Sequence, residues 1–249
     1  MARTESVVIG DVHGCAEELD ELLEILLEDD PTRTIRLVGD LLTKGPDPGG
    51  VVDAIAGARR LGVDIHSVCG NHDLSLHHAL AATRGRATPH DLRPRDRETI
   101  ARLGDPRRHA AALALLDETV ARTISRAGPA TVVHAGIDPR RGLEGTTPHE
   151  LVHLKAAAGE TPWWERYDGR DGLIVFGHKP ASRPIRATRS DAPIAVNVDT
   201  GCVLGGRLPA YLVERDEFIS VESRQVPRRN RFARADDGGT GHVGTPLAG

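Results

Sequence analysis

The chain has 249 residues and a formal net charge of -4, with 32 basic and 36 acidic side chains. This length allows one domain with a full core, and the charge balance excludes a strongly basic field, so nucleic acid is not an obligatory partner. No apolar run approaches the roughly 20 residues of a membrane helix, and the first ten residues lack a signal-peptide pattern. We expect a soluble cytoplasmic protein whose three cysteines, Cys15, Cys69 and Cys202, are buried fillers rather than disulfide partners.

The first predicted strand, over 7–9, leads directly into Gly10-Asp11-Val12-His13-Gly14. An aspartate and a histidine two residues apart at the end of a strand can face one cation, and glycines let the backbone pass close to it. The leucines between Leu19 and Leu27 have the spacing of an amphipathic helix, which Asp29-Asp30-Pro31 ends. The sequence therefore predicts a βα unit with Asp11 and His13 at its turn.

Two further units repeat this pattern. Strands are expected over 35–38 and 63–68, and helices over 49–61 and 74–82. The first of these strands leads into Asp40 and the second into Asn71 and His72. Right-handed crossovers would place the three strands in a mostly parallel sheet with helices outside, and ligands bind at the carboxyl ends of such strands.

Arginines and prolines alternate between residues 83 and 108, and this segment has two interpretations. It forms either a cap that meets a polyanion or a solvated linker with short helices whose arginines pair with nearby acids. The linker is the favoured interpretation. A buried helix is expected next, over 110–123.

Strands over 131–133 and 173–176 lead into His134 and His178, with a short helix over 148–155 between them. Trp163 and Trp164 share one loop, and two adjacent tryptophans do not easily both face inward. One of them is therefore expected to line a pocket.

The last part of the chain alternates as strands do over 194–198, 210–214 and 217–221, which predicts a second, partly antiparallel sheet. Residues 1–226 are expected to form one domain. The remainder, 227–249, has hardly any large apolar residues and is expected to be a disordered tail.

Six residues at strand ends share the chemistry of metal ligands: Asp11, His13, Asp40, Asn71, His134 and His178. They exceed the needs of one tetrahedral ion, whereas two ions bridged by one carboxylate use them all. We therefore predict a dinuclear centre with Asp40 as the bridge. Two ions about 3.5 to 4 Å apart can clamp a phosphoryl group, lower the pKa of a shared water and stabilise an in-line displacement. The predicted reaction is hydrolysis of a phosphate ester or anhydride.

These motifs, together with Gly39-Asp40, Gly70-Asn71-His72-Asp73, His134-Ala135-Gly136 and Gly177-His178, resemble the signatures of the phosphoprotein phosphatase family of calcineurin-like metallophosphoesterases over roughly residues 6–221. The resemblance implies an α/β fold, a four-layer α-β-β-α sandwich, with two divalent transition-metal ions, Mn first, then Fe, Zn, Co or Ni. It assigns Asp11, His13 and Asp40 to one metal and Asp40, Asn71, His134 and His178 to the other. His72 matches the family's general acid.

Within the family the chain looks most like the ApaH-like bacterial symmetrical dinucleoside tetraphosphatases, which implies hydrolysis of diadenosine tetraphosphate to two ADP. Lys155 matches by position an arginine of that branch, and we expect it to bind substrate phosphate together with Lys44. The eukaryotic protein phosphatases carry Asp-Arg where this chain has Thr43-Lys44, and a lysine is a point charge where arginine is a fork.

Two alternatives stay open. A bacterial serine/threonine protein phosphatase would favour a shallow groove, and the segment between His134 and His178 is shorter than in the tetraphosphatases. A scaffold without catalysis is disfavoured, because the chain retains every ligand and His72.

Overall fold

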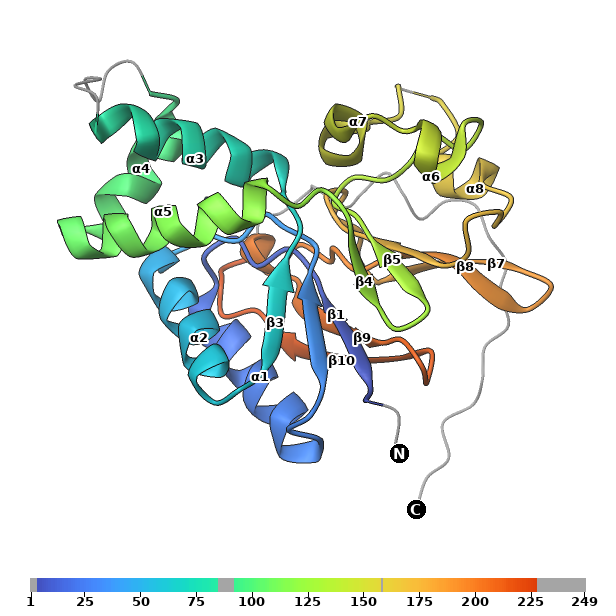
Figure 1. Cartoon of the computed structure of the whole chain (residues 1–249), viewed down its shortest axis with the longest axis horizontal. Coiled ribbons are helices and arrows are strands. Elements are labelled where there is room, and N and C mark those ends of the chain that lie inside the picture. Colours follow the sequence, from blue (N-terminus) through green and yellow to red (C-terminus); the bar gives the residue numbers. More distant parts are fainter. Residues whose placement is uncertain (1–3, 85–91, 158, 228–249) are drawn as a thin grey trace.

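Two five-stranded β-sheets form the centre of the molecule (Figure 1). The computed structural model describes residues 4–84, 92–157 and 159–227. Within these ranges, helices cover the outer side of each sheet, so the layers follow the order helix, sheet, sheet, helix. The expected four-layer α-β-β-α sandwich is confirmed. The predicted tail lies outside the described residues, apart from Pro227.

The first sheet carries the N-terminal motif. It consists of β1 (Ser6–Ile9), β2 (Thr34–Leu37), β3 (Asp64–Ser67), β9 (Arg207–Leu212) and β10 (Glu217–Glu222), in the order β10-β9-β1-β2-β3. The strands β1, β2 and β3 are parallel, and β9 is antiparallel to both β1 and β10. The prediction that 210–214 and 217–221 join a second sheet is wrong. Alternation identifies a strand but not its partner, and β9 pairs with the free edge of β1, with Val7 opposite Leu212.

The second sheet carries the two later histidine motifs. It consists of β4 (Ser125–Ala127), β5 (Ala130–Val132), β6 (Ile174–Phe176), β7 (Ile185–Arg189) and β8 (Ala192–Asn197), in the order β4-β5-β6-β8-β7. The three strands β5, β6 and β8 are parallel. Of the three late strands predicted from alternation, only the one over 194–198 belongs here.

The helices begin where local sequence favours a start. They are α1 (Ala16–Asp29), α2 (Pro48–Arg60), α3 (Asn71–Arg84), α4 (Pro94–Leu103), α5 (Pro106–Val120), α6 (Gly142–Gly145), α7 (Pro148–His153) and α8 (Trp163–Arg166), with a 3-10 turn η2 over Cys202–Leu204. Asp47 caps α2 by accepting a 2.8 Å bond from the Gly50 amide, and Asp105 caps α5 in the same way.

The described part of the segment rich in arginine and proline forms two helices, and Arg102 pairs with Glu98 as the linker interpretation expected. Pro94 and Pro106 stand in the first turns of α4 and α5, where a proline's missing N–H costs nothing. Leu103 and Leu116 are buried against the rest of the helical layer. Two prolines of this segment thus begin packed helices, whereas residues 85–91 lie outside the described ranges.

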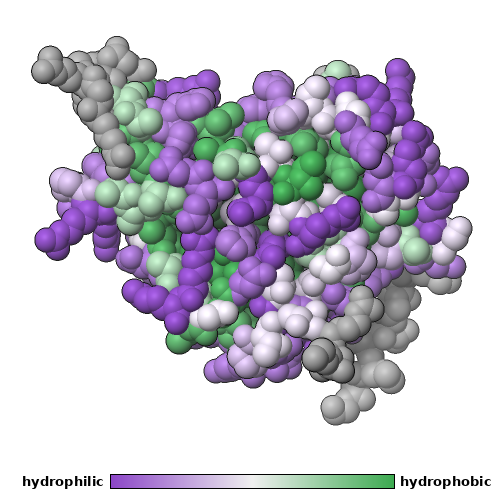
Figure 2. Space-filling view, viewed as in Figure 1, coloured by the Kyte–Doolittle hydropathy of each residue, from purple (hydrophilic) through white to green (hydrophobic). Residues whose placement is uncertain are grey.

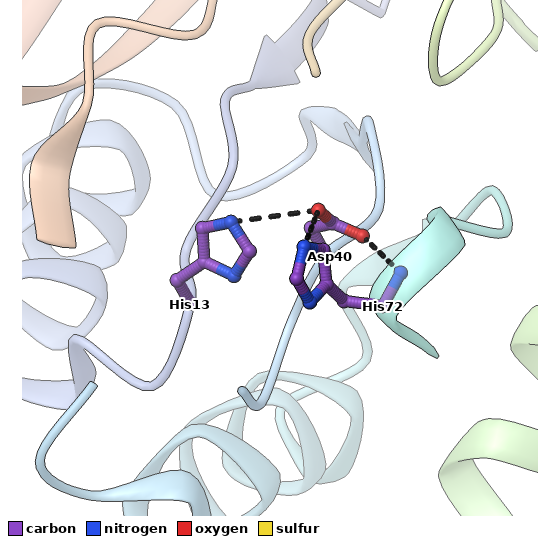
Figure 3. A group of neighbouring side chains, drawn as sticks. All are labelled: His13, Asp40 and His72. Atoms are coloured by element: carbon purple, nitrogen blue, oxygen red, sulfur yellow. Dashed lines mark hydrogen bonds and ion pairs between the residues drawn. The ribbon is translucent and has the colours of Figure 1, made fainter. Parts of the chain in front are cut away.

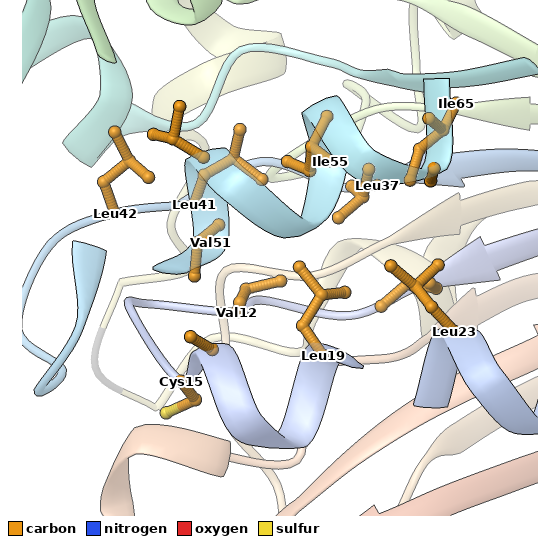
Figure 4. Close-up of a cluster of buried hydrophobic side chains, with 14 of the residues drawn as sticks. Val12, Cys15, Leu19, Leu23, Leu37, Leu41, Leu42, Val51, Ile55 and Ile65 are labelled. Atoms are coloured by element: carbon orange, nitrogen blue, oxygen red, sulfur yellow. The ribbon is translucent and has the colours of Figure 1, made fainter. Parts of the chain in front are cut away.

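Three groups of buried side chains hold the layers together. The largest joins the helices to the first sheet, and Figure 4 shows Leu19 of α1 and Ile55 of α2 there, near Leu37 of β2. The second fills the space between the sheets, with Val8 and Val175. The third covers the outer side of the second sheet. Full burial of one leucine contributes about 1.5 to 3 kcal/mol, so each group is a substantial source of stability.

The two tryptophans belong to the third group, which corrects the expectation that they cannot both face inward. Trp163 and Trp164 are 5% and 6% exposed. Their rings lie 4.7 and 5.2 Å from that of Phe176, and Trp163 donates its Nε1–H to the Ala135 carbonyl at 3.2 Å. Trp163 also borders a cavity, so the expectation that one tryptophan lines a pocket is confirmed for this residue.

Hydrophilic residues cover much of the face in Figure 2, and hydrophobic ones show between them as separate patches. No helix in the described ranges has the length and apolar character needed to cross a bilayer. The three cysteines are free and buried, as expected of small fillers.

Candidate metal centre

The loops after five strands meet at one end of the sandwich. The six expected ligands follow these strands in chain order: Asp11 and His13 after β1, Asp40 after β2, Asn71 after β3, His134 after β5 and His178 after β6. Because β1, β2 and β3 are parallel to one another, as are β5 and β6, their carboxyl ends open on common edges. The site is therefore built by the topology of both sheets.

The carboxylate of Asp40 lies at the middle of the site. His13 Nε2 is 3.4 Å from Oδ2, His72 Nε2 is 3.9 Å from the same oxygen, and His134 Nε2 is 3.6 Å from Oδ1. Figure 3 shows His13 and His72 turned toward Asp40 from different elements. The backbone amide of His72 also donates to Oδ1 at 2.9 Å. A carboxylate with both oxygens facing imidazoles is therefore a candidate for the bridging ligand.

A second group of donors lies beside it. His134 Nε2 is 3.2 Å from Asn71 Oδ1 and 3.1 Å from His178 Nδ1. His134 Nδ1 lies 2.7 Å from the Val38 carbonyl, which can only accept, so this nitrogen carries the proton. The lone pair of Nε2 therefore faces Asn71, His178 and Asp40, which is the orientation a metal-binding histidine needs.

The backbone is unusual at the same positions. Seven non-glycine residues in the described ranges have positive φ, and four of them belong to the site: His13, Asp40, Lys44 and His178, with φ between 48 and 74°. Such conformations cost energy and persist where the surroundings impose them. Strain gathered in this way indicates a functional site.

Two glycines make room for the carboxylates. A Cβ at Gly70 would lie 2.1 Å from Asp40 Oδ1, and one at Gly177 would lie 2.0 Å from Asp11 Oδ1. Neither distance is possible for real atoms. The absence of a side chain at Gly70 and Gly177 therefore leaves room for carboxylates that come from other loops.

A cavity of about 420 Å³ opens onto these residues. It is lined by three cationic side chains, Lys44, Arg95 and Lys155, and by the acidic Asp199 and Glu98. Lys155 comes two residues after the end of α7, is exposed, and also borders the second cavity beside Trp163. Both lysines expected to bind phosphate thus face the same space as the candidate ligands.

Asp199 and Arg95 were missed as site residues. Asp199 comes two residues after β8 and is 5% exposed, so the strand-end rule used for the other ligands also identifies it. Arg95 comes from α4, a helix that the sequence pattern did not resolve.

Burial raises the pKa values of the carboxyl groups in the site and lowers those of the histidines. It raises the pKa of Asp40 to about 6 and that of Asp199 to about 7. It lowers the pKa of His134 to about 3 and that of His178 to about 2. The neutral imidazole is the form of histidine that binds metal. A bound cation would stabilise the ionised form of the crowded carboxylates.

Two further observations fit a bound cation. The buried Nε2 of His178 has no hydrogen-bond partner among the described residues. The Lys44 ammonium lies 2.8 Å from His13 Nε2, and the charges of Asp40, Asp11 and Asp199 act on it. A positive group thus already stands beside a candidate ligand nitrogen, and the donor set suits transition metals.

Carboxylate, amide and imidazole donors beside a cationic cavity are typical of metal-dependent hydrolases that act on phosphate. The family model of the calcineurin-like phosphoesterases matches residues 6–206, and the chain belongs to this family. The protein is therefore a hydrolase of the phosphatase class, and enzymes of this family use divalent metal ions.

Two relatives and one solved structure carry names that refer to dinucleoside tetraphosphates. The chain is 30% identical to a bis(5'-nucleosyl)-tetraphosphatase PrpE [asymmetrical] of Bacillus velezensis over 260 residues, covering 93% of this chain and 97% of the relative. It is 29% identical to a symmetrical bis(5'-nucleosyl)-tetraphosphatase of Paracidovorax citrulli over 284 residues, covering 88% and 97%. The solved structure of a "putative diadenosine tetraphosphatase" aligns with a TM-score of 0.65 and 26% identity, covering 89% of this chain and 95% of that one.

Proposed function

We propose that the protein hydrolyses dinucleoside tetraphosphates at a dinuclear metal centre. The main support is one cavity that is lined both by candidate metal ligands and by cationic side chains suited to a polyphosphate. The names of the relatives point to the same substrate class. They favour it over the protein phosphatase alternative.

In this proposal Asp11, His13 and Asp40 hold one ion, and Asp40, Asn71, His134 and His178 hold the other. Mn²⁺ is the first choice, because carboxylate, amide and imidazole donors together suit it. When bound, the two ions polarise the phosphoryl group and lower the pKa of a water molecule. Asp40, facing both halves of the site, keeps the two ions together.

His72 is proposed to protonate the leaving oxygen. It borders the cavity, and its Nδ1 has no partner among the described residues. Burial and the charge of Lys44 lower its pKa to about 2, so the imidazole alone is neutral at pH 7. The negative charge of a polyphosphate opposes this shift. In this proposal the phosphate charge, acting against the charge of the bound ions, favours the protonated form of His72.

We infer the position of cleavage from a comparison of two relatives. The alignment with the asymmetrical enzyme covers more of this chain within fewer aligned residues than the alignment with the symmetrical one, so it has fewer gaps. This closer agreement in length favours asymmetrical cleavage, to ATP and AMP, in place of the two ADP that the sequence resemblance implies.

Product analysis tests both parts of this function. Diadenosine tetraphosphate, a phosphopeptide and an aryl phosphate are incubated with the Mn²⁺-loaded enzyme, and nucleotide products are separated by ion exchange. We expect ATP and AMP in equal amounts and a kcat/KM above that for the phosphopeptide. Two ADP would support the symmetrical reaction, and a better phosphopeptide substrate would restore the protein phosphatase interpretation.

The cellular compartment is a separate inference. Three buried free thiols fit a reducing environment, and we infer that the enzyme works in the cytoplasm.

A further inference from the structure

The helix α4 is held over the candidate metal centre from two sides. The carboxylate of Asp96 accepts a 2.6 Å bond from the Ser75 hydroxyl of α3, the helix that begins with Asn71 and His72. At the other end of α4, Arg102 donates to the carbonyls of Lys44 and Gly45 at 3.2 and 2.7 Å. The helix is therefore tied both to the element that carries His72 and to the loop after Asp40.

The position of α4 brings the Arg95 side chain to the cavity. Arg95 lies in the first turn of α4 and lines the same space as Lys44, His72 and Lys155. Lys155 reaches this space from beyond α7, on the side of the second sheet, whereas α4 packs beside α3 (Figure 1). Cationic groups thus border the cavity from different elements.

Among the described residues, no hydrogen-bond partner is found for the Arg95 guanidinium. Its closest acidic atom in the described ranges is Asp96 Oδ1, 3.7 Å from Nε, and neither atom makes a hydrogen bond there. Its side chain remains 35% exposed. The neighbouring acid that also lines the cavity, Glu98, is paired with Arg102 at 2.7 Å. A guanidinium with unused donors at a cavity wall is suited to an anion.

The Lys44 ammonium is already engaged deep in the site. It lies 2.8 Å from His13 Nε2 among the carboxylates, so it belongs with the reacting phosphate. A chain of phosphates carries further charge beyond the reacting phosphate. Arginine binds two phosphate oxygens at once, which lysine does not.

We propose that Arg95 binds a non-reacting phosphate of the polyphosphate chain and that α4 is the cap that selects polyphosphates over monophosphate esters. The inference rests on the proposed function, because it assigns a second contact to the same substrate. For the described residues of α4, it favours the interpretation of a cap that meets a polyanion.

The first test compares two substrates in three variants. Arg95→Ala should lower kcat/KM for diadenosine tetraphosphate about 10- to 100-fold, mainly through KM, the usual range for a lost charged hydrogen bond. The rate with p-nitrophenyl phosphate should stay within about 3-fold, since that ester has only the reacting phosphate. Arg95→Lys should recover part of the loss. Arg97→Ala, on the exposed side of the same helix, serves as the matched control and should match the wild type.

The second test measures binding directly and does not need a dinucleotide reaction. Calorimetric titration with inorganic tripolyphosphate in excess Mn²⁺ should show affinity reduced about 10-fold or more in Arg95→Ala, whereas orthophosphate should bind as it does to the wild type. Equal losses with both ligands, or unchanged tripolyphosphate affinity, would overturn the role of Arg95. If the wild type left dinucleotides intact while this difference persisted, the proposed substrate would fail and the assignment of Arg95 would stand.

Discussion

The carboxylate of Asp73 accepts a 2.7 Å hydrogen bond from the backbone amide of Asp40, 33 positions earlier in the chain. It also accepts from the amides of Leu41 and Gly70, at 2.8 and 3.0 Å. Asp73 lies in the first turn of α3, and these bonds connect the loop after β2 with the loop after β3. Asp73 therefore helps to fix the backbone position of Asp40, from which the candidate ligand extends.

We expect Asp73→Asn to weaken both folding and catalysis. An amide side chain has one acceptor oxygen and directs N–H groups at backbone donors, so at least one buried donor loses its partner. That loss costs about 1 to 3 kcal/mol of unfolding free energy. Urea denaturation and steady-state kinetics measure the two effects, and Asp53→Asn on the exposed side of α2 is the control. Unchanged stability would show that the three bonds contribute nothing net.

His72→Asn should leave metal binding intact and lower turnover about 10²-fold or more, the scale of a general acid. Diadenosine tetraphosphate and p-nitrophenyl phosphate should suffer unequally, because a good leaving group needs less help from a proton donor. Equal losses would make His72 a positioning residue. His78→Asn, an exposed histidine of the same helix, should behave as the wild type.

Two metal ions per chain are expected by elemental analysis of the Mn²⁺-loaded protein. Chelation should abolish activity, and Mn²⁺ or Co²⁺ should restore it better than Ca²⁺, because imidazole ligands suit transition metals. Asp40→Asn should reduce the bound metal below one ion, since this residue serves both sites. A stoichiometry of one in the wild type would contradict the bridging role.

The two lysines should differ in their effects. Lys44→Ala should lower kcat/KM for all phosphate substrates, since its ammonium lies among the candidate ligands. Lys155 is exposed at the edge of the cavity, so Lys155→Ala should affect diadenosine tetraphosphate more than an aryl phosphate. A neutral Lys155→Ala on every substrate would remove that residue from the site. Lys179→Ala is a suitable control, because that ammonium lies over the Trp164 ring.

Metal affinity should fall on acidification. Burial raises the pKa of Asp40 to about 6 and of Asp199 to about 7, above the ordinary 3.8, so below pH 6 a metal must displace protons from these groups. Each displaced proton weakens binding about tenfold per pH unit in that window. The increase in Tm that Mn²⁺ produces should therefore shrink between pH 7.5 and 5.5.

The Tm of the metal-free protein should depend on pH in a different way. Raised carboxyl pKa values contribute stability that is present below the unfolded value of 3.8 and lost as pH rises through about 6 to 7. The lowered pKa of His134, about 3, contributes stability that is present above 6.5 and lost as the pH falls toward 3. These trends oppose each other between pH 4 and 6.5, so its Tm should vary less there than that of the metal-loaded form. An equal dependence in both forms would contradict this account.

The positions of the candidate ligands were predictable because strand ends are local signals. An apolar run followed by glycine and a ligand residue identifies the place of His134 without knowledge of its sheet. The same rule, applied to the run before Asp199, would have added that residue. This rule could not identify Arg95, because Arg95 belongs to a helix whose position depends on contacts with α2, α3 and α5.

The pairing of strands was not predictable in the same way. The alternation in 207–212 is equally compatible with either sheet, and only the free edge of β1 decides between them. Likewise, the inward orientation of both tryptophans depends on the space beside Phe176, which no local pattern reveals.

Because β1 pairs with β9, the first sheet can be completed only late in the synthesis of the chain. The strand that delivers Asp11 and His13 keeps an open edge until Leu212 and its neighbours have left the ribosome. A nascent chain that already contains all six candidate ligands still has an incomplete first sheet, with apolar strand edges exposed to other chains. The strand that leads into Asp11 and His13 therefore gains its second neighbour in the sheet only when the last strands of the chain have been synthesised.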